Sequence, residues 1–557
     1  MIREFARNVV SLRATSGEAS LSVEKLDKLS WLVRGASADR PLTLTYEVYA
    51  WDLSVRAAHL DTTHGFFNGT SVFLAVDGQT ERTCIIDIEK PEGLDYRDWR
   101  VVTSLPRLQR GVGAARPYGF GLYEASCYDE LVDHPVEMGR FTLARFEASG
   151  VPHDVALTGR HDCDTGRLVA DLQRICEWEV SLFGEPAPMD YYAFLVMVVG
   201  DGYGGLEHRA STALIASRGD LPWPGMEGTP EGYKTFLGLC SHEYFHSWNV
   251  KRIKPAVFSP YDLAAENYTR LLWAFEGFTS YYDDLALVRS GVIALEDYLG
   301  LLGKTISNVL RTPGRFRQSV AESSFDAWIK YYRQDENSPN AIVSYYSKGA
   351  LIALALDLQM RSATDGRLSL DDVMRFLWQH HGLTGVGVAE EGIYSAVADV
   401  ATMAGERALG SRLSRWLRKA VEGTEDIALD RLLKPFGVTL RVAAAGKGPN
   451  LGAKLASGGA ELRLANVFDD GPAQRAGLSA GDVLVAVDGL RVGGSGLDAM
   501  LARRVPGERV EIHAFRRDEL MRFDVELGEP VADTVTLGLA SHPTALAATR
   551  RRGWLGG

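Results

Sequence analysis

Residues 241–249 read Ser-His-Glu-Tyr-Phe-His-Ser-Trp-Asn and contain the pattern His-Glu-x-x-His. On a helix, residues four apart lie on one face about one turn apart, so His242 and His246 can offer two imidazole nitrogens to one metal ion. A catalytic zinc ion takes three protein ligands and lowers the pKa of a bound water to about 7. Glu243 stands beside the first histidine and can accept the proton of that water. The pattern therefore predicts zinc-dependent hydrolysis.

The residues before this pattern favour a helix. Residues 229–231, Thr-Pro-Glu, are typical of a helix start, with an N-cap, a proline at the first helical position and an acid in the first turn. Phe236 and Leu239 supply an apolar face that runs into the motif. We expect the helix to end near Asn249. The alternative is a helix with two buried histidines and a surface glutamate.

The composition restricts the class of protein. A chain of 557 residues predicts two to four domains, and a net charge of −12 argues against a general nucleic-acid binder. The five cysteines are scattered and form no Cys-x-x-Cys pair, which argues against a disulfide scaffold or a cysteine zinc site. Cys240 is interpreted as a buried helical thiol.

The chain lacks a run of eighteen apolar residues, so we expect no membrane span. Residues 1–7 contain acid and base where a secretory signal would have an apolar core. The chain as given is therefore predicted to be cytoplasmic.

The first part of the chain is predicted to be rich in β-strands. Strands are expected at residues 42–49, 71–76, 83–88 and 141–146, which together indicate a β-sandwich-like domain. A helix is expected over residues 165–182 and an apolar strand over 191–199. The next stretch, residues 200–208, contains four glycines that would let a backbone or a ligand approach closely, although an ordinary glycine-rich loop explains it equally well.

Residues 229–435 are predicted to be mainly helical. One long helix is expected over 269–290, a second over 344–362, and a third after a capping arrangement of Ser369 and Asp372. The first of these carries Glu276, and the chain between His246 and Glu276 is long enough for a loop and a return helix. Two imidazoles and one carboxylate would complete a zinc site. Taken alone, Glu276 is equally well explained as a surface glutamate.

The C-terminal part changes in composition. Residues 443–450 are predicted to be a linker, and the run Ala-Gly-Leu-x-x-Gly-Asp-x-apolar within residues 462–489 resembles a bacterial PDZ domain. PDZ domains bind peptide C-termini by adding a strand to a sheet edge. The end of the chain, which contains Arg-Arg-Arg at 550–552, is expected to be frayed and solvated.

Several ordered motifs together resemble the bacterial PDZ-containing glycyl aminopeptidases. They are His-Glu-Tyr-Phe-His-x-Trp-Asn from His242, Trp-x-x-Glu-Gly-x-Thr-x-Tyr-Tyr from Trp273, the run 128–137 and the PDZ run. That family belongs to the gluzincin group with a thermolysin-like fold. The resemblance covers nearly the whole chain and implies a multidomain α+β protein. The expected parts are an N-terminal β-sandwich-like domain (1–160), a thermolysin-like catalytic domain (161–310), a helical domain (311–437), a PDZ domain (438–530) and a tail (531–557).

The resemblance also assigns roles to individual residues. Gly204, Gly205 and Glu207 match the Gly-x-Met-Glu-Asn strand of related aminopeptidases, in which the glutamate holds the free amine of the substrate; His208 stands where those enzymes have asparagine. Tyr346 matches the tyrosine of a Tyr-x-Lys-Gly segment whose hydroxyl stabilises the oxyanion. The neighbouring Tyr345 is the second choice.

Two features depart from the family pattern. The resemblance implies more β-structure before the point where this chain begins, so the start resembles the interior of a domain. A periplasmic location is the alternative to a cytoplasmic one if the true N-terminus is missing. Ser280 stands where thermolysin-like enzymes often carry an aspartate that orients a histidine. Asp283 or Asp284 could serve instead, and the sequence does not decide between them.

These observations predict a zinc aminopeptidase. His242, His246 and Glu276 would hold Zn²⁺, and Glu243 would act as general base and then as proton donor. The resemblance implies peptide substrates with a free N-terminus and a small first residue, glycine or alanine. The alternatives are a zinc endopeptidase built on the same site and a PDZ adaptor with an inactive peptidase fold. A peptide C-terminus is the expected PDZ partner, with no nucleic acid and no membrane.

Overall fold

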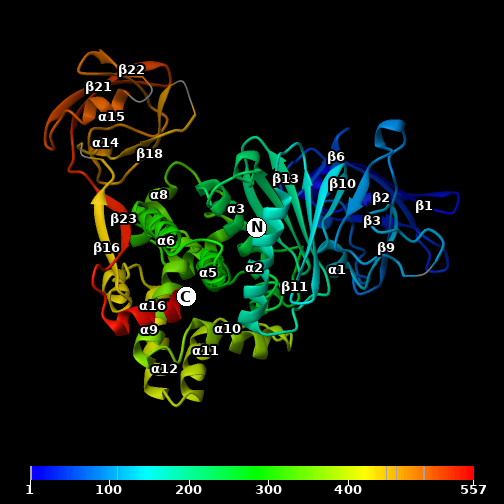
Figure 1. Ribbon diagram of the computed structural model, residues 1–557. Coiled ribbons are helices and arrows are strands. Elements are labelled where there is room, and N and C mark those ends of the chain that lie inside the picture. Colours follow the sequence, from blue (N-terminus) through cyan, green and yellow to red (C-terminus); the bar gives the residue numbers. More distant parts are fainter. Residues whose placement is uncertain (1–2, 110, 447, 459–460, 494–495, 557) are drawn as a thin grey trace. The chain divides into compact units, whose positions relative to one another are not determined.

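The computed structural model describes residues 3–109, 111–446, 448–458, 461–493 and 496–556. These residues divide into two compact units. The first unit contains residues 3–252 and 290–293, and the second contains residues 253–289 and 294–556. Both units combine helices with sheets, which confirms the α+β class (Figure 1).

The regular structure in the first 140 residues, coloured blue to cyan in Figure 1, consists mainly of antiparallel sheets. This confirms a β-rich N-terminal domain, and the strands expected near residues 42–49 and 83–88 are present. The first sheet has the order β3 (Trp31–Arg34), β2 (Ala19–Lys25), β1 (Val9–Ser16), β4 (Thr43–Val48). The second has the order β5 (Ala58–Leu60), β6 (His64–Phe67), β10 (Val136–Gly139), β8 (Arg100–Val102). The third pairs β7 (Cys84–Ile88) with β9 (Gly121–Ala125).

The strand predicted at residues 71–76 is wrong. The chain there makes a short 3-10 turn, Gly69–Ser71, and then an irregular segment. Two backbone carbonyls in this segment accept hydrogen bonds from tyrosine hydroxyls. Tyr46 donates to Val72 O at 2.9 Å and Tyr128 donates to Phe73 O at 2.8 Å. The apolar run at these residues therefore belongs to an irregular segment and not to a strand of a sheet.

A five-stranded mixed sheet follows, and one of its strands contains the predicted substrate-binding residues Gly204, Gly205 and Glu207. β13 is buried along almost its whole length and pairs in parallel with both of its neighbours, as expected for a strand covered on both faces. The helix α2 (Thr165–Phe183) makes the crossover into it and confirms the helix expected at 165–182. The strand order is β11 (Phe141–Ala148), β12 (Val151–Thr158), β13 (Tyr192–Val199), β15 (Ser211–Ser217), β14 (Tyr203–Glu207). The predicted division places β11 and β12 in the N-terminal domain (1–160), but both strands belong to the same sheet as β13. The five-part division of the chain stays a prediction.

The helix that carries the His-Glu-x-x-His motif is α3 (Glu231–Phe245). It is one turn shorter than the expected end at Asn249. The N–H groups of Ser247 and Trp248 bond carbonyls three residues back, which tightens the last turn. The indole of Trp248 is buried and stacks on Phe183 with ring centroids 4.8 Å apart.

The second unit is mainly helical. The helix α9 (Ser347–Thr364) is almost fully buried and confirms the helix expected at 344–362. The capping arrangement is also confirmed, because Asp372 Oδ2 accepts the Ser369 N–H at 2.8 Å. The other long helices are α5 (Thr279–Arg289), α6 (Leu295–Leu310), α10 (Leu370–Leu377), α11 (Gly392–Met403) and α12 (Arg407–Glu422).

The single helix predicted over 269–290 is wrong. The chain forms α4 (Leu272–Phe275) and then α5, with the break at residues 276–278. Thr279 Oγ1 donates to Phe275 O at 2.6 Å, and this kind of side-chain bond to the preceding turn bends helices. Glu276 therefore lies at a junction between two helices.

The PDZ fold is inserted between two strands of the helical unit. β16 (Val438–Ala444) precedes it, β23 (Ala532–Leu539) follows it, and the two strands pair with each other. Asn450 and Gly528, which flank the PDZ fold, form an isolated bridge with two backbone hydrogen bonds of 2.9 Å. The strands of the PDZ sheet are β17 (Ala453–Leu455), β18 (Leu462–Val467), β19 (Val483–Val487), β20 (Leu490–Arg491), β21 (Arg509–Arg516) and β22 (Glu519–Glu526).

The expectation of a frayed C-terminal end is wrong. Val535 in β23 donates its N–H to Ser307 Oγ of α6 at 2.8 Å. The last helix, α16 (Ala545–Leu555), buries Trp554 completely, and the indole N–H donates to Tyr281 OH at 3.0 Å. The basic run 550–552 suggested a solvated end, although these charged residues lie beside the buried Trp554 in the sequence. Residues after the PDZ fold therefore belong to the core of the second unit.

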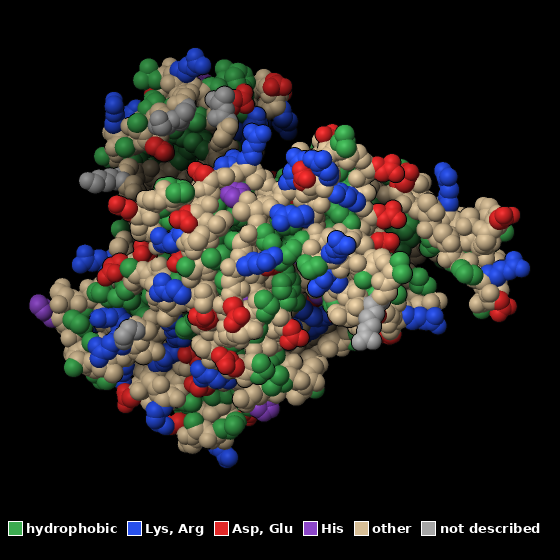
Figure 2. All heavy atoms as spheres, turned by 45° about the vertical axis from the view of Figure 1, so that its right-hand side comes forward, with side chains coloured by type: hydrophobic (Ala, Val, Ile, Leu, Met, Phe, Trp, Pro, Cys, Tyr) green, Lys and Arg blue, Asp and Glu red, His purple; other side chains and the backbone are tan. Residues whose placement is uncertain are grey.

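The face shown in Figure 2 mixes acidic and basic side chains over most of its area. The helices within the described segments include none that is apolar enough over eighteen residues to traverse a bilayer.

Candidate active site

The two histidines of the motif lie together at the end of α3. Their Nε2 atoms are 3.1 Å apart, and the rings stand almost perpendicular, with an interplanar angle of 84°. His246 Nδ1 lies 2.6 Å from the carbonyl oxygen of Asn249, which can only accept a hydrogen bond. Nδ1 of His246 is therefore the protonated nitrogen, and Nε2 presents a lone pair to a metal ion. The motif spacing alone did not reveal this role of the Asn249 carbonyl.

Glu243 is buried on the same helix and lies against the edge strand β14. A Cβ atom added at Gly205 would lie 2.1 Å from Glu243 Oε1, so a larger residue there would displace the Glu243 carboxylate from this position. The expectation that these glycines permit a close approach holds at Gly205, while a Cβ at Gly204 would meet nothing within 4 Å. Close packing between the strand and the carboxylate places Glu243 beside the edge strand of the sheet.

Glu207 is the last residue of β14 and is half-buried. The turn after it is anchored by Asp133: its Oδ1 lies 3.4 Å from His208 Nδ1, and its Oδ2 accepts the Arg209 N–H at 3.0 Å. Lys251 Nζ lies 2.6 Å from the same carboxylate. Burial would raise the pKa of Asp133, but Lys251 and His208 outweigh burial and hold that pKa well below its usual range. Asp133 thus positions the end of the Glu207 strand, a role that its place in the run 128–137 did not reveal.

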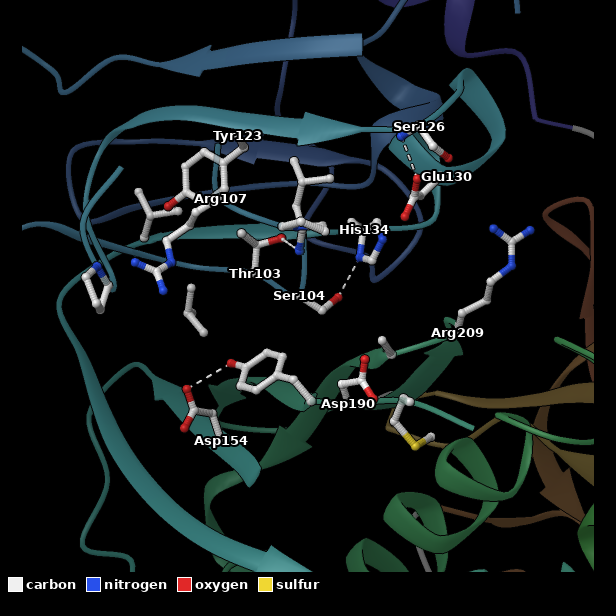
Figure 3. A pocket seen from close by; sticks show the side chains of 18 of the residues that line it. Thr103, Ser104, Arg107, Tyr123, Ser126, Glu130, His134, Asp154, Asp190 and Arg209 are labelled. Atoms are coloured by element: carbon white, nitrogen blue, oxygen red, sulfur yellow. Dashed lines mark hydrogen bonds between the residues drawn. The ribbon is translucent and has the colours of Figure 1, made fainter. Parts of the chain in front are cut away.

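A cavity of about 850 Å³ borders this turn within the first unit (Figure 3). On one wall, Ser104 Oγ lies 2.7 Å from His134 Nδ1. Burial, opposed by Asp133, lowers the pKa of His134 to about 4, so the imidazole is neutral at pH 7. On the opposite wall, Asp154 accepts hydrogen bonds from two tyrosine hydroxyls, of which Tyr191 lies at 2.8 Å. Arg209 lines the cavity two residues after Glu207.

In the second unit, the junction that bears Glu276 is clamped to the start of α9 by two glycines. A Cβ at Gly277 would lie 2.6 Å from the backbone of Gly349, and a Cβ at Gly349 would lie 2.9 Å from Gly277 Cα. Both positions therefore need glycine, because one backbone crosses directly over the other. This crossing explains the glycines of the Glu-Gly and Tyr-x-Lys-Gly segments and holds Glu276 near Tyr346.

Tyr346 belongs to a cluster of tyrosines at the start of α9. Its hydroxyl lies 3.0 Å from the hydroxyl of Tyr332, and the Tyr345 hydroxyl donates to the same oxygen at 3.1 Å. Tyr345 is fully buried, whereas Tyr346 is half-buried. Burial and the negative charge of Glu276 both raise the pKa of Tyr346. Its phenol therefore stays protonated and can donate. Tyr332 was missed, although the pair at 331–332 was visible in the sequence.

Cys240 is buried as expected, and burial raises the pKa of its thiol well above the usual range. All five cysteines are free. Whether Asp283 or Asp284 orients a histidine stays a prediction.

The sequence and fold match known peptidases. A family model described as M61 glycyl aminopeptidase matches residues 235–352, the model of its N-terminal domain matches 1–140, and a PDZ model matches 449–527. The crystal structure of an aminopeptidase N family protein from Idiomarina loihiensis is 43% identical, has a TM-score of 0.92, and the match covers 100% of this chain and 93% of that chain.

Two further matches are weaker. A probable periplasmic serine endoprotease DegP-like from Hahella chejuensis (strain KCTC 2396) is 36% identical over 86 residues, which is 15% of this chain and 18% of that protein. The chain thus matches about a fifth of that curated relative. An M1 zinc metallopeptidase from Deinococcus radiodurans is 13% identical with a TM-score of 0.46, covering 76% of this chain and 89% of that chain, a distant likeness from which we infer nothing.

The fold, the motif and these matches define a metallopeptidase of the aminopeptidase class. The chain belongs to the M61 glycyl aminopeptidase family.

Proposed function

We propose that this protein is a zinc aminopeptidase that removes small N-terminal residues, glycine or alanine, from peptides. The observation that carries the proposal is the His242–His246 pair, with Nε2 atoms 3.1 Å apart, next to a buried carboxylate packed on an edge strand. Glu276 is proposed as the third ligand, on the grounds of its motif and its position at a clamped helix junction.

The donor set fits zinc. Neutral imidazoles and a carboxylate are zinc ligands, and His2Glu is a known catalytic combination. The tautomer that the Asn249 carbonyl imposes on His246 presents Nε2, as a metal ligand requires. Zinc bound there would supply Lewis acidity that polarises the peptide carbonyl and lowers the pKa of water.

The chain's own groups would then move protons and hold charge. Glu243 would accept a proton from the attacking water and deliver it to the leaving amine. Tyr346, protonated and half-buried, would donate a hydrogen bond to the oxyanion. The edge of β14 would bind the substrate backbone, and Glu207 at its end would hold the free amine.

The role of Glu207 distinguishes an aminopeptidase from an endopeptidase, because only an aminopeptidase needs a group that binds the free amine of the substrate. Wild type is expected to cleave glycyl and alanyl reporter substrates and to leave the N-acetylated forms intact, because the acetyl group removes the charge that Glu207 would bind. Glu207→Gln should raise KM for the free substrates by about 10-fold or more. Steady-state hydrolysis of both reporters by both proteins is the measurement. Equal cleavage of free and acetylated substrate would indicate an endopeptidase.

The PDZ domain is proposed to capture longer peptides or partners. Its strand β17 lies at the edge of the sheet, so a peptide C-terminus could add a strand there. Leu455 of this strand and Met500 of the helix α15 (Gly496–Leu501) are both partly buried and pack on the PDZ core. Peptide binding by this edge would be independent of the metal site.

We expect the PDZ domain to be dispensable for the smallest substrates. A truncation near residue 445 would also remove β23 and α16, which are part of the second unit's core, so the clean change is excision of residues 450–528. The bridge between Asn450 and Gly528 shows that a short glycine-serine linker can join the ends. Activity on an aminoacyl reporter should stay within about threefold of wild type.

Asn340→Ala is the matched control for the excision, because two hydrogen bonds join Asn340 to the PDZ fold. Asn340 donates to Val467 O at 2.9 Å and accepts the Asp469 N–H at 3.1 Å. Asn340→Ala loosens this contact while the domain remains. If the folded excision protein and Asn340→Ala both lose activity on the smallest reporter, the PDZ domain is part of the active-site architecture.

A further inference from the structure

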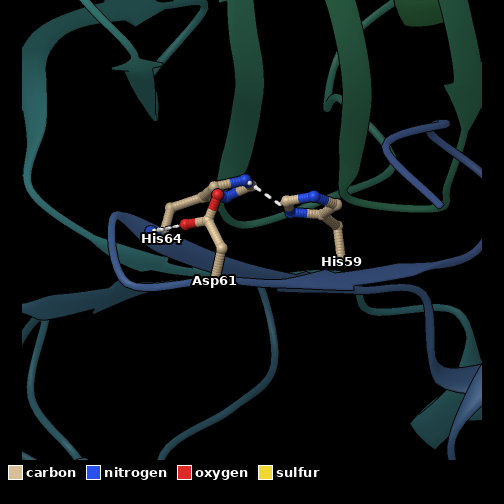
Figure 4. A group of neighbouring side chains, drawn as sticks. All are labelled: His59, Asp61 and His64. Carbon is tan, nitrogen blue, oxygen red and sulfur yellow. Dashed lines mark hydrogen bonds between the residues drawn. The ribbon is translucent and has the colours of Figure 1, made fainter. Parts of the chain in front are cut away.

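A second group of metal-ligand residues lies in the N-terminal β domain, on the hairpin formed by β5 and β6. The chain reads His59-x-Asp61-x-x-His64 around the turn. His59 is opposite Phe66 in the strand register, so His64, two residues before Phe66, lies on the same face diagonally across from His59. Asp61 is two residues after His59. The register therefore places all three side chains together, as Figure 4 shows.

The ligand atoms of this group converge. His59 Nδ1 lies 3.0 Å from His64 Nε2, and the ligand atoms of all three residues lie within 4.8 Å of one another. The nitrogen separation is close to the 3.1 Å between His242 Nε2 and His246 Nε2 in the proposed catalytic site. The nitrogen spacing in the hairpin therefore matches that of the His242–His246 pair, for which the sequence motif already supports a metal-binding role.

A second layer of hydrogen bonds prepares His64 for this role. Glu137 Oε1, on the adjacent strand β10, lies 3.3 Å from His64 Nδ1 and also accepts the Thr158 hydroxyl at 3.0 Å. When Glu137 accepts a hydrogen bond from the Nδ1–H group of His64, the lone pair of Nε2 is left facing His59 and Asp61. Metal-binding histidines very often have such a carboxylate partner.

Asp61 is held in place by the turn. Its Oδ1 accepts the N–H and the hydroxyl of Thr63, both at 2.6 Å, and the His64 N–H at 3.1 Å. Among the described residues these hydrogen bonds all fall on Oδ1, which leaves Oδ2 as the ligand atom. The turn therefore fixes the carboxylate without occupying the oxygen that would bind a cation.

The site is sheltered and has room for one more ligand. The exposed fractions of His59 and His64 are 8% and 4%. A cavity of about 20 Å³, lined by both histidines, Ser54 and Glu137, adjoins them, enough for about one water molecule. A four-coordinate ion could thus take two nitrogens, one carboxylate oxygen and one water.

We propose that His59, Asp61 and His64 bind a divalent transition metal of the zinc class, at a site separate from the His242–His246 pair. Two imidazoles and one carboxylate favour zinc over calcium or magnesium, which prefer oxygen ligands. The metal clamps the β5–β6 hairpin and stabilises the N-terminal β domain. A hydrogen-bonded imidazole pair without metal is the competing explanation, and the test separates the two.

The test is the zinc content of the full-length protein after equilibration with zinc and removal of the excess, measured by elemental analysis. Wild type should hold about two zinc ions per chain, and His59→Gln and His246→Ala about one each. His59→Gln should keep aminopeptidase activity and lose part of the zinc-dependent rise in Tm. His542→Gln, which changes an exposed histidine outside both groups, should match wild type.

A milder variant guards against misfolding of His59→Gln. Glu137→Gln keeps the shape of the side chain and should weaken zinc binding at the hairpin by about 10–100-fold. If His59→Gln is folded and keeps the full wild-type zinc content, or if zinc binding is unchanged by Glu137→Gln, the hairpin holds a hydrogen-bonded pair and the proposal is wrong. Failure of the proposed catalytic site looks different, because His246→Ala would then keep the wild-type zinc content.

Discussion

Glu243→Gln is expected to lower kcat by about 10²–10⁴-fold while the protein keeps its metal. Glutamine has the same shape as glutamate, so the close contact with Gly205 in β14 is preserved. It cannot accept the proton of the attacking water or pass one to the leaving amine. His242 and His246 remain, so the metal ligands are untouched. Steady-state kinetics on a glycyl reporter, together with zinc analysis of the same sample, provide the measurement.

The matched control for Glu243→Gln is His246→Ala, which should lose both activity and metal at the motif. A Glu243→Gln protein with near-normal kcat would show that the general base is another residue. Loss of the motif metal from Glu243→Gln would show that this carboxylate acts as a ligand.

Tyr346→Phe is the second large effect, with an expected fall in kcat of about 10²–10³-fold, as for other single oxyanion donors. The change keeps the ring and its packing and removes only the hydroxyl that lies 3.0 Å from Tyr332. Because negative charge on the oxyanion grows during addition, the donor acts on the transition state more than on bound substrate. KM should change little, and zinc content should be unchanged. Kinetics on the glycyl reporter measure both parameters.

Tyr345→Phe supplies the control for Tyr346→Phe. Both hydroxyls bond Tyr332, but Tyr345 is fully buried and so is poorly placed to reach a substrate. Its loss should cost stability more than rate. The reverse ranking of the two variants would identify Tyr345 as the donor, and near-normal rates in both would remove the phenol from the mechanism.

The sequence predicted the local features that depend on short spacing. His242 and His246 are four positions apart, which suffices to put both rings at one end of a helix, and the apolar run 191–199 suffices to predict the buried strand β13. Ser369 and Asp372 were recognised as a cap for the same reason. In each case the deciding interaction lies within about one turn or one strand.

Features that depend on contacts distant in the chain were missed. The break between α4 and α5 accompanies a crossing of Gly277 over Gly349, which helical periodicity cannot reveal. The irregular segment after Gly69 is set by the hydroxyls of Tyr46 and Tyr128, which come from other elements. The pairing of β16 with β23 across the whole PDZ insertion joins residues 88 to 101 positions apart. No local pattern encodes such partners.

We propose that hydrolysis depends on zinc at the His-Glu-x-x-His motif. The most direct test is hydrolysis of a glycyl reporter by wild-type protein that has been depleted with a chelator and then titrated with zinc. We expect activity to vanish on depletion and to return as zinc fills the motif site, in His59→Gln as well as in wild type. Full activity in protein shown to be free of metal would rule out zinc-dependent hydrolysis at this motif.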